Sequence, residues 1–140
     1  MKRLALTLLA LGFTAGLLAP GASWAQPAPP ACDLDTVHGW WDNDARAFRG
    51  VRHDPGVADC TLVVYTYRVP ATWDGTWPSA TAYPQTLVSS TPIVVTGKRQ
   101  TIPVTDCGGQ VDLGLPGAPT VLTSTRDGGP WVASHIGKAL

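Results

Sequence analysis

The chain has 140 residues, and its ten basic and ten acidic side chains give a formal net charge of zero. This length fits one domain, and the balanced charge argues against nucleic acid or an anionic membrane as the main partner, since either requires a basic patch. All ten acidic residues are aspartate and the chain holds 15 Gly and 13 Pro, a composition that favours short strands and tight turns over helices.

The first 25 residues have the layout of a secretory signal peptide. Lys2-Arg3 form a basic head, an apolar run extends from Leu4 to Ala19, and Ser23-Trp24-Ala25 ends in small residues suited to cleavage. The run is shorter than the about 20 apolar residues that span a bilayer. We therefore expect a secreted, extracellular protein that does not insert into a membrane after cleavage.

Residues 26–35 predict a spacer, because the stretch from Gln26 to Ala31 is rich in proline and favours an extended chain. Residues 36–140 predict one folded domain. Apolar runs of strand length follow one another there, at residues 37–41, 46–52, 61–69, 86–96, 100–104, 110–115, 119–125 and 131–136.

These runs predict an all-β fold, an immunoglobulin-like antiparallel β-sandwich of about seven strands, with a small β-barrel as the alternative. Gly97-Lys98-Arg99 predicts a hairpin turn between the strands that flank it, and Asp127-Gly128-Gly129 predicts a second turn. Alternation along the strands predicts an interior that includes Val63, Tyr65, Tyr67, Val69, Val94, Ile102, Val104, Val111 and Leu113.

The three cysteines are disulfide candidates, because an exported protein folds in an oxidising compartment. Three pairings are possible. Cys60–Cys107 is favoured, since each cysteine lies beside a strand and such a bridge would pin two sheets together. Cys32 lies near the end of the folded part and is then expected to be a free thiol, which could also join two copies of the chain.

The segment between the predicted strands 61–69 and 86–96 is a long loop that carries two tryptophans. Flat indole faces stack on sugar rings, so Trp73 and Trp77 form a candidate carbohydrate site, with Asp74 available to sugar hydroxyls. The alternative is that both indoles pin the loop by packing. Trp40, Trp41 and Trp131 are interpreted as packing residues.

Catalytic and metal-binding patterns are not readable in the sequence. His38, His53 and His135 show no metal-ligand spacing, and a His53-Asp54 acid–base pair lacks a serine in a nucleophile elbow. Asp42-Asn43-Asp44 could offer oxygen ligands to calcium but is more typical of a turn. We therefore expect no enzyme activity, no cofactor and no metal.

Three motifs resemble a segment of secreted and cell-wall-anchored actinobacterial proteins of the Streptomyces type. They are Tyr67-Arg68-Val69-Pro70, the stretch Tyr83 to Leu87, and the stretch Asp106 to Leu113, so that the likeness covers roughly residues 60–115. The resemblance implies an immunoglobulin-like extracellular module of no established activity. Unlike the anchored members, this chain ends at Gly137 to Leu140 without a sorting signal, so we expect release, or attachment to the envelope without a covalent link.

The sequence thus predicts a non-catalytic structural or interaction module of the cell envelope or extracellular space. One alternative is a carbohydrate-binding module that uses the loop tryptophans on cell-wall or extracellular polysaccharide. Another is a small secreted protein inhibitor that presents residues 70–84 to an enzyme. A partner could also be another surface protein.

Overall fold

The structure is a computed structural model, and it describes residues 27–105, 109–124 and 131–136. These residues form eight strands and two short 3-10 turns, η1 (Leu34–Thr36) and η2 (Ala80–Ala82). None of the described helical segments is long and apolar enough to cross a membrane. The predicted signal peptide and the predicted turn at 127–129 lie outside the described residues.

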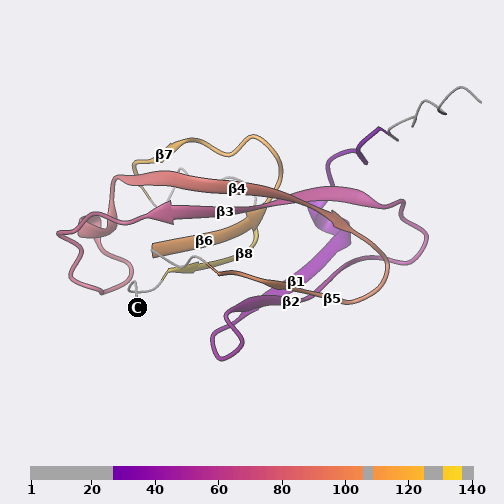
Figure 1. The fold of residues 1–140 in the computed structure, drawn as a ribbon, viewed down its shortest axis with the longest axis horizontal. Helices are drawn as coiled ribbons and strands as arrows, with labels where there is room; N and C mark the ends of the chain where they lie inside the picture. Colours follow the sequence, from indigo (N-terminus) through magenta and orange to yellow (C-terminus); the bar gives the residue numbers. More distant parts are fainter. Residues whose placement is uncertain (1–26, 106–108, 125–130, 137–140) are drawn as a thin grey trace, which may run out of the picture.

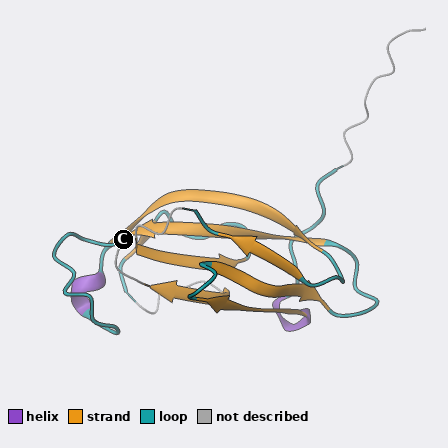
Figure 2. Cartoon of the chain, turned by 60° about the horizontal axis from the view of Figure 1, so that its bottom comes forward, coloured by secondary structure: helices purple, strands orange, loops and turns teal. Residues whose placement is uncertain are grey.

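Two antiparallel sheets face each other (Figures 1 and 2). The smaller sheet has the order β1 (Val37–Asp42), β2 (Ala47–His53), β5 (Gln100–Pro103). The larger sheet has the order β7 (Val121–Leu122), β4 (Gln85–Val95), β3 (Cys60–Arg68), β6 (Gly109–Gly114), β8 (Trp131–Ile136). The predicted all-β sandwich is confirmed, with eight strands in place of about seven.

The main core fills the space between the two sheets. Phe48 and Val51 of β2 are fully buried there, as are Leu62 of β3 and Val111 and Leu113 of β6. Each such side chain stabilises the fold by about 1.5–3 kcal/mol relative to an exposed position. This layer therefore holds the two sheets together.

A second apolar cluster lies on the other face of β3. Val63, Tyr65 and Tyr67 pack there with Leu122 of β7. The Tyr65 hydroxyl donates to the Leu115 carbonyl at 2.8 Å, and the Tyr67 hydroxyl donates to the Pro119 carbonyl at 2.9 Å. These bonds hold the segment between β6 and β7 over the sheet, so β3 is buried on both faces.

Six of the nine residues expected in the interior are buried, and three are not. Val69 and Ile102 are half-buried, whereas Val94 is 46% exposed. Among the described residues, β4 pairs with β7 only at Gln85 and Thr86, so most of its outer edge is open to solvent. Val94 pairs with Thr61 and so lies on the same outer face of the larger sheet as Val63, and alternation alone did not reveal that this end of the face is left uncovered.

The predicted hairpin at Gly97-Lys98-Arg99 is wrong. β4 pairs with β3 in the larger sheet, whereas β5 pairs with β2 in the smaller one. The backbone N–H of His53, at the end of β2, donates to the Thr96 carbonyl at 3.1 Å and draws the chain toward the smaller sheet as it leaves β4. The three residues therefore connect the two sheets.

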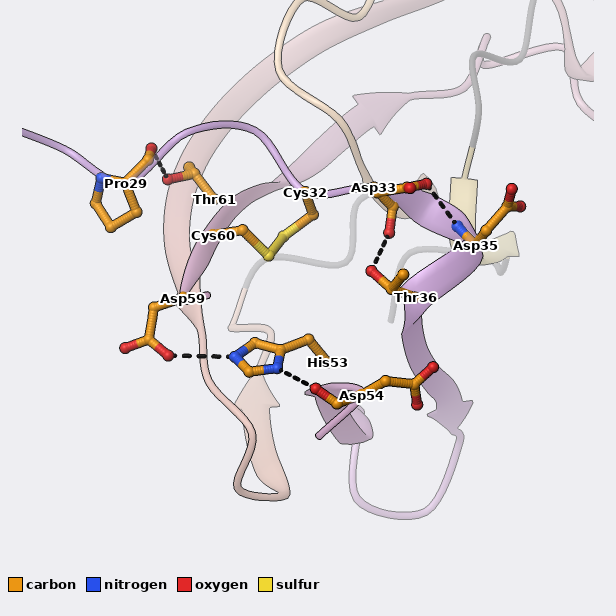
Figure 3. Close-up of a disulfide and its surroundings, with 10 residues drawn as sticks. All are labelled: Pro29, Cys32, Asp33, Asp35, Thr36, His53, Asp54, Asp59, Cys60 and Thr61. Carbon is orange, nitrogen blue, oxygen red and sulfur yellow. Dashed lines mark hydrogen bonds and ion pairs between the residues drawn. A yellow bond between two sulfur atoms is a disulfide. The ribbon is translucent and has the colours of Figure 1, made fainter. Parts of the chain in front are cut away.

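The predicted Cys60–Cys107 bridge and the free thiol at Cys32 are also wrong, because Cys32 is bonded to Cys60 (Figure 3). Ala31 pairs in parallel with Thr61, whose N–H donates to the Pro30 carbonyl at 2.7 Å. This pairing brings the Cα atoms of the two cysteines to 4.8 Å. Cys107 lies outside the described residues.

The predicted spacer 26–35 is therefore attached to the domain from Pro29 onward. The Thr61 hydroxyl donates to the Pro29 carbonyl at 2.8 Å, and the Cys32 N–H donates to the Thr61 carbonyl at 3.1 Å. These contacts begin before the boundary expected at residue 36. Residues 27–35 lie at the opposite end of the sandwich from loop 70–84 (Figures 1 and 2).

Candidate functional site

Loop 70–84 joins β3 to β4 and is shaped by its own hydrogen bonds. The Trp73 backbone N–H donates to the Pro70 carbonyl at 3.0 Å, and its indole N–H donates to the Thr76 carbonyl at 2.8 Å. Asp74 Oδ1 accepts from the Thr76 hydroxyl at 2.7 Å and from the Thr76 N–H at 2.8 Å. Gly75, between them, has a φ of 82°, which a glycine adopts without steric cost.

The Asp74 carboxylate is thus engaged by the loop. The hydrogen bonds from Thr76, first from its hydroxyl and then from its N–H, lower the pKa of Asp74 because they stabilise the charged form. Trp73 is half-buried and tied to Thr76. Both residues therefore serve first to hold the shape of the loop.

Trp77 is the exposed aromatic residue of this loop, with 47% of its surface accessible. Its ring lies 5.9 Å from that of Tyr83, centroid to centroid, at an interplanar angle of 50°. Tyr83 also lines a pocket of about 360 Å³. The pocket is formed by Pro78, Ser79, Ala80, Tyr83, Thr123 and Ser124.

The pocket combines one aromatic side chain with three hydroxyl-bearing ones. Thr123 and Ser124 come from the segment after β7, which pairs with the start of β4 at Gln85–Leu122. Ser79 caps η2 by accepting from the Thr81 N–H at 3.2 Å. Aromatic planes with nearby hydroxyls offer both stacking and hydrogen bonding to a small polar ligand.

Of the predicted ligand residues, the structure leaves Trp77 exposed beside this pocket, half-buries Trp73, and uses Asp74 within the loop. Sequence reasoning did not include Tyr83, or Thr123 and Ser124, which are distant in the chain. Tyr83 could have been found, because it lies near the end of the loop in an aromatic-Pro pair like Trp77-Pro78. The hydroxyl residues required knowledge of the β4–β7 pairing.

The histidines lie outside this pocket. His53 is buried, with its Nδ1 2.9 Å from the Asp54 backbone carbonyl oxygen and its Nε2 3.2 Å from the Asp59 carboxylate, so the ring donates to both when it is protonated (Figure 3). The bond to the Asp54 carbonyl, followed by that to Asp59, raises the pKa of His53. His38 contacts the Asp54 carboxylate at 2.7 Å and is half-exposed. Both histidines therefore contact Asp54 but at different atoms.

The third histidine has a packing role, and the acidic turn is held by a hydrogen bond of its own. His135 stacks on Trp41 at 4.9 Å, and burial lowers its pKa. Asp42 Oδ1 accepts from the Ala45 N–H at 2.9 Å, as expected of a turn residue. Across the part of the chain that the structure describes, no three His, Cys or Asp side chains gather as metal ligands.

Comparisons with protein-family models, with curated proteins and with solved structures find no match to this chain. The resemblance to actinobacterial surface proteins therefore stays a prediction. The function has to be argued from the site itself.

Proposed function

We propose that this protein is a secreted, non-catalytic binding module of the cell envelope or extracellular space, and that loop 70–84 binds polysaccharide. The observation that carries the proposal is the exposed Trp77 beside Tyr83 and its hydroxyl-lined pocket. A tryptophan residue that is 47% exposed leaves apolar area in water. Covering that area with the C–H face of a sugar ring would recover part of the hydrophobic free energy.

The chemistry around Trp77 fits a sugar better than an apolar ligand. Ser79, Thr123 and Ser124 bring hydroxyl groups to the pocket wall, which can exchange hydrogen bonds with sugar hydroxyls. The pocket volume of about 360 Å³ is within the range of small-molecule sites, which is about 300–1,000 Å³. We infer that one or two sugar units of a longer chain enter it.

The internal hydrogen bonds of the loop support a binding role. Trp73 and Asp74 hold the turn before Trp77, so less conformational entropy is lost when a ligand orders the loop. Secretion is part of the same proposal. It is supported by the layout of residues 1–25 and by the Cys32–Cys60 disulfide, a bond typical of oxidising compartments.

A second candidate function is a protein inhibitor that presents the loop to an enzyme. The observation in its favour is that hydrogen bonds at Trp73, Asp74 and Ser79 hold the loop although it contains no cysteine. Such a loop would bind an enzyme in its free conformation. Binding of a protein in place of a polysaccharide by the same residues would favour this candidate.

The test is retention of the purified protein on cell walls, cellulose and chitin. Trp77→Ala removes the exposed ring, and Val88→Ala is the matched control, because Val88 is 44% exposed on β4. We expect the wild type and Val88→Ala to be retained on at least one of the three materials and Trp77→Ala to be retained clearly less on it, with thermal unfolding unchanged. Equal retention of all three proteins, or none on any material, would overturn the proposal.

A further inference from the structure

The most exposed large apolar side chain among the described residues lies far in sequence from loop 70–84. Trp40 of β1 is 53% exposed, more than Trp77. Its neighbour Trp41 packs against the core between Phe48 at 5.1 Å and His135 at 4.9 Å. Because successive residues of a strand point to opposite faces, Trp40 lies on the outer face of the smaller sheet. Sequence reasoning had interpreted Trp40 as a packing residue, which the structure corrects.

The ring of Trp40 is held in place by a bulge in β2. Trp40 pairs with Arg49 and His38 pairs with Arg52, so two steps along β1 correspond to three along β2. The extra residue brings Gly50 into the ladder with a φ of 66°. A Cβ at Gly50 would overlap the six-membered ring of Trp40, so the indole lies directly against this glycine. The contact with Gly50 of β2 therefore holds the ring in place, while more than half of the Trp40 residue stays exposed to solvent.

Polar side chains surround this indole, and their charges are largely neutralised. Arg49 forms an ion pair with Asp42 at 3.0 Å, and its side chain is 48% exposed. On the other side, Asp54 contacts His38 at 2.7 Å and Arg52 at 3.8 Å. A guanidinium group has five N–H donors, so an arginine in such a pair can still donate to a ligand hydroxyl.

We propose that this surface, formed by Trp40, Arg49 and Asp42 with His38, Arg52 and Asp54, is a second binding site for a neutral polysaccharide. The ring gives a flat apolar surface for the C–H face of a sugar, and the flanking pairs offer donors and acceptors for its hydroxyls. Because each cation faces a carboxylate, the surface lacks the unpaired positive charge that a strongly anionic ligand would need.

The second site extends the proposed function but does not depend on the geometry of loop 70–84. Its residues come from β1, β2 and Asp54, and loop 70–84 contributes none of them. Two sites on one chain raise the retention on a polymer beyond that of either alone, since binding at the first makes binding at the second intramolecular. The two sites can therefore be tested separately with single variants.

The experiment measures depletion isotherms of the full protein on insoluble cellulose and chitin. The variants are Trp40→Ala, Trp40→Tyr, Trp77→Ala, the double variant Trp40→Ala/Trp77→Ala and the control Val94→Ala, a position that is 46% exposed on β4. We expect Trp40→Ala to weaken binding by about tenfold, the double Trp40→Ala/Trp77→Ala variant to lose it, and Trp40→Tyr to restore part of it. Val94→Ala should follow the wild type.

Each outcome bears on one of the two sites. Wild-type affinity in Trp40→Ala together with loss in Trp77→Ala overturns the second site and leaves the loop site standing. Loss in Trp40→Ala with wild-type affinity in Trp77→Ala supports the second site and overturns the loop site. No binding by the wild type to either polymer overturns the second site. Near-ultraviolet circular dichroism checks that each variant keeps its fold.

Discussion

The indole ring of Trp40 lies directly over the backbone of Gly50. If Gly50 carried a Cβ atom, the ring carbons Cη2 and Cε3 of Trp40 would lie 2.6 and 2.9 Å from it, and Cζ3 would be closer still. Gly56, three residues after the end of β2, also has a positive φ, of 85°, but nothing lies within 4 Å of its Cβ position. The two glycines therefore separate the effect of backbone conformation from the effect of the ring.

Gly50→Ala is expected to destabilise the protein more than Gly56→Ala. Both substitutions place alanine in the left-handed region, at a cost of about 1–2 kcal/mol. Only Gly50→Ala adds the overlap with Trp40, and overpacking of this kind costs about 1–3 kcal/mol. Denaturant unfolding of the two variants measures the difference. Equal losses would show that the ring of Trp40 does not rest on Gly50.

His53 is expected to stabilise the fold most at acidic pH. Only the protonated ring donates from both nitrogens, to the Asp54 carbonyl and to the Asp59 carboxylate, and this raises the pKa of His53 above the usual 6.5. The stabilisation is thus fully present below pH 6.5 and is lost as the pH rises through the raised pKa. The pKa of His135 is shifted in the opposite direction, so its titration also changes the stability with pH. The measurement is therefore the difference in unfolding free energy between wild type and His53→Gln. A difference that grows with rising pH would contradict this assignment.

Tyr67→Phe is expected to cost about 0.5–1.5 kcal/mol, because it removes the hydrogen bond to the Pro119 carbonyl. Burial, with a smaller contribution from Asp112, raises the pKa of Tyr67 to about 12. The neutral phenol is therefore favoured in the folded state, and its stabilisation is lost as the pH rises above 10. Unfolding curves of wild type and Tyr67→Phe should converge at alkaline pH. A constant gap across this range would argue against the buried hydroxyl.

The Cys32–Cys60 bond is expected in peptide maps of the unreduced protein. It closes a segment with a sequence separation of 28, for which the chain-entropy model gives a stabilisation of about 3–4 kcal/mol. The Cys32→Ala/Cys60→Ala variant should lose about this much, and Cys107→Ala should leave the bond intact. A map that links Cys60 to Cys107 would instead restore the pairing expected from the sequence.

The strands could be predicted from the sequence, but their partners could not. The run from Thr61 to Val69 was found because its residues favour an extended chain and alternate. The run is also almost continuously apolar, which is typical of a strand that is buried on both faces. The partner of β5 depends on contacts such as that of His53 with Thr96, which no local pattern encodes.

The disulfide pairing and the full set of site residues could not be predicted for a related reason. Cys32 was expected to be a free thiol because it lies near the end of the folded part, in a proline-rich spacer, whereas the carbonyl groups of Pro29 and Pro30 accept hydrogen bonds from Thr61. Proline cannot donate in a ladder but can accept in one. In the same way, Trp77 was readable as a loop aromatic, but Thr123 and Ser124 reach its vicinity only through pairing between β4 and β7.

The central claim, that residues around Trp77 contact a polysaccharide, is tested most directly by mapping backbone amide shifts during titration. The ligand is a soluble oligosaccharide of the polymer that retains the protein. We predict that the largest shifts fall within residues 77–84 and at Thr123 and Ser124, with a smaller set around Trp40. Shifts that spare residues 77–84 and 123–124 at saturation would contradict the account.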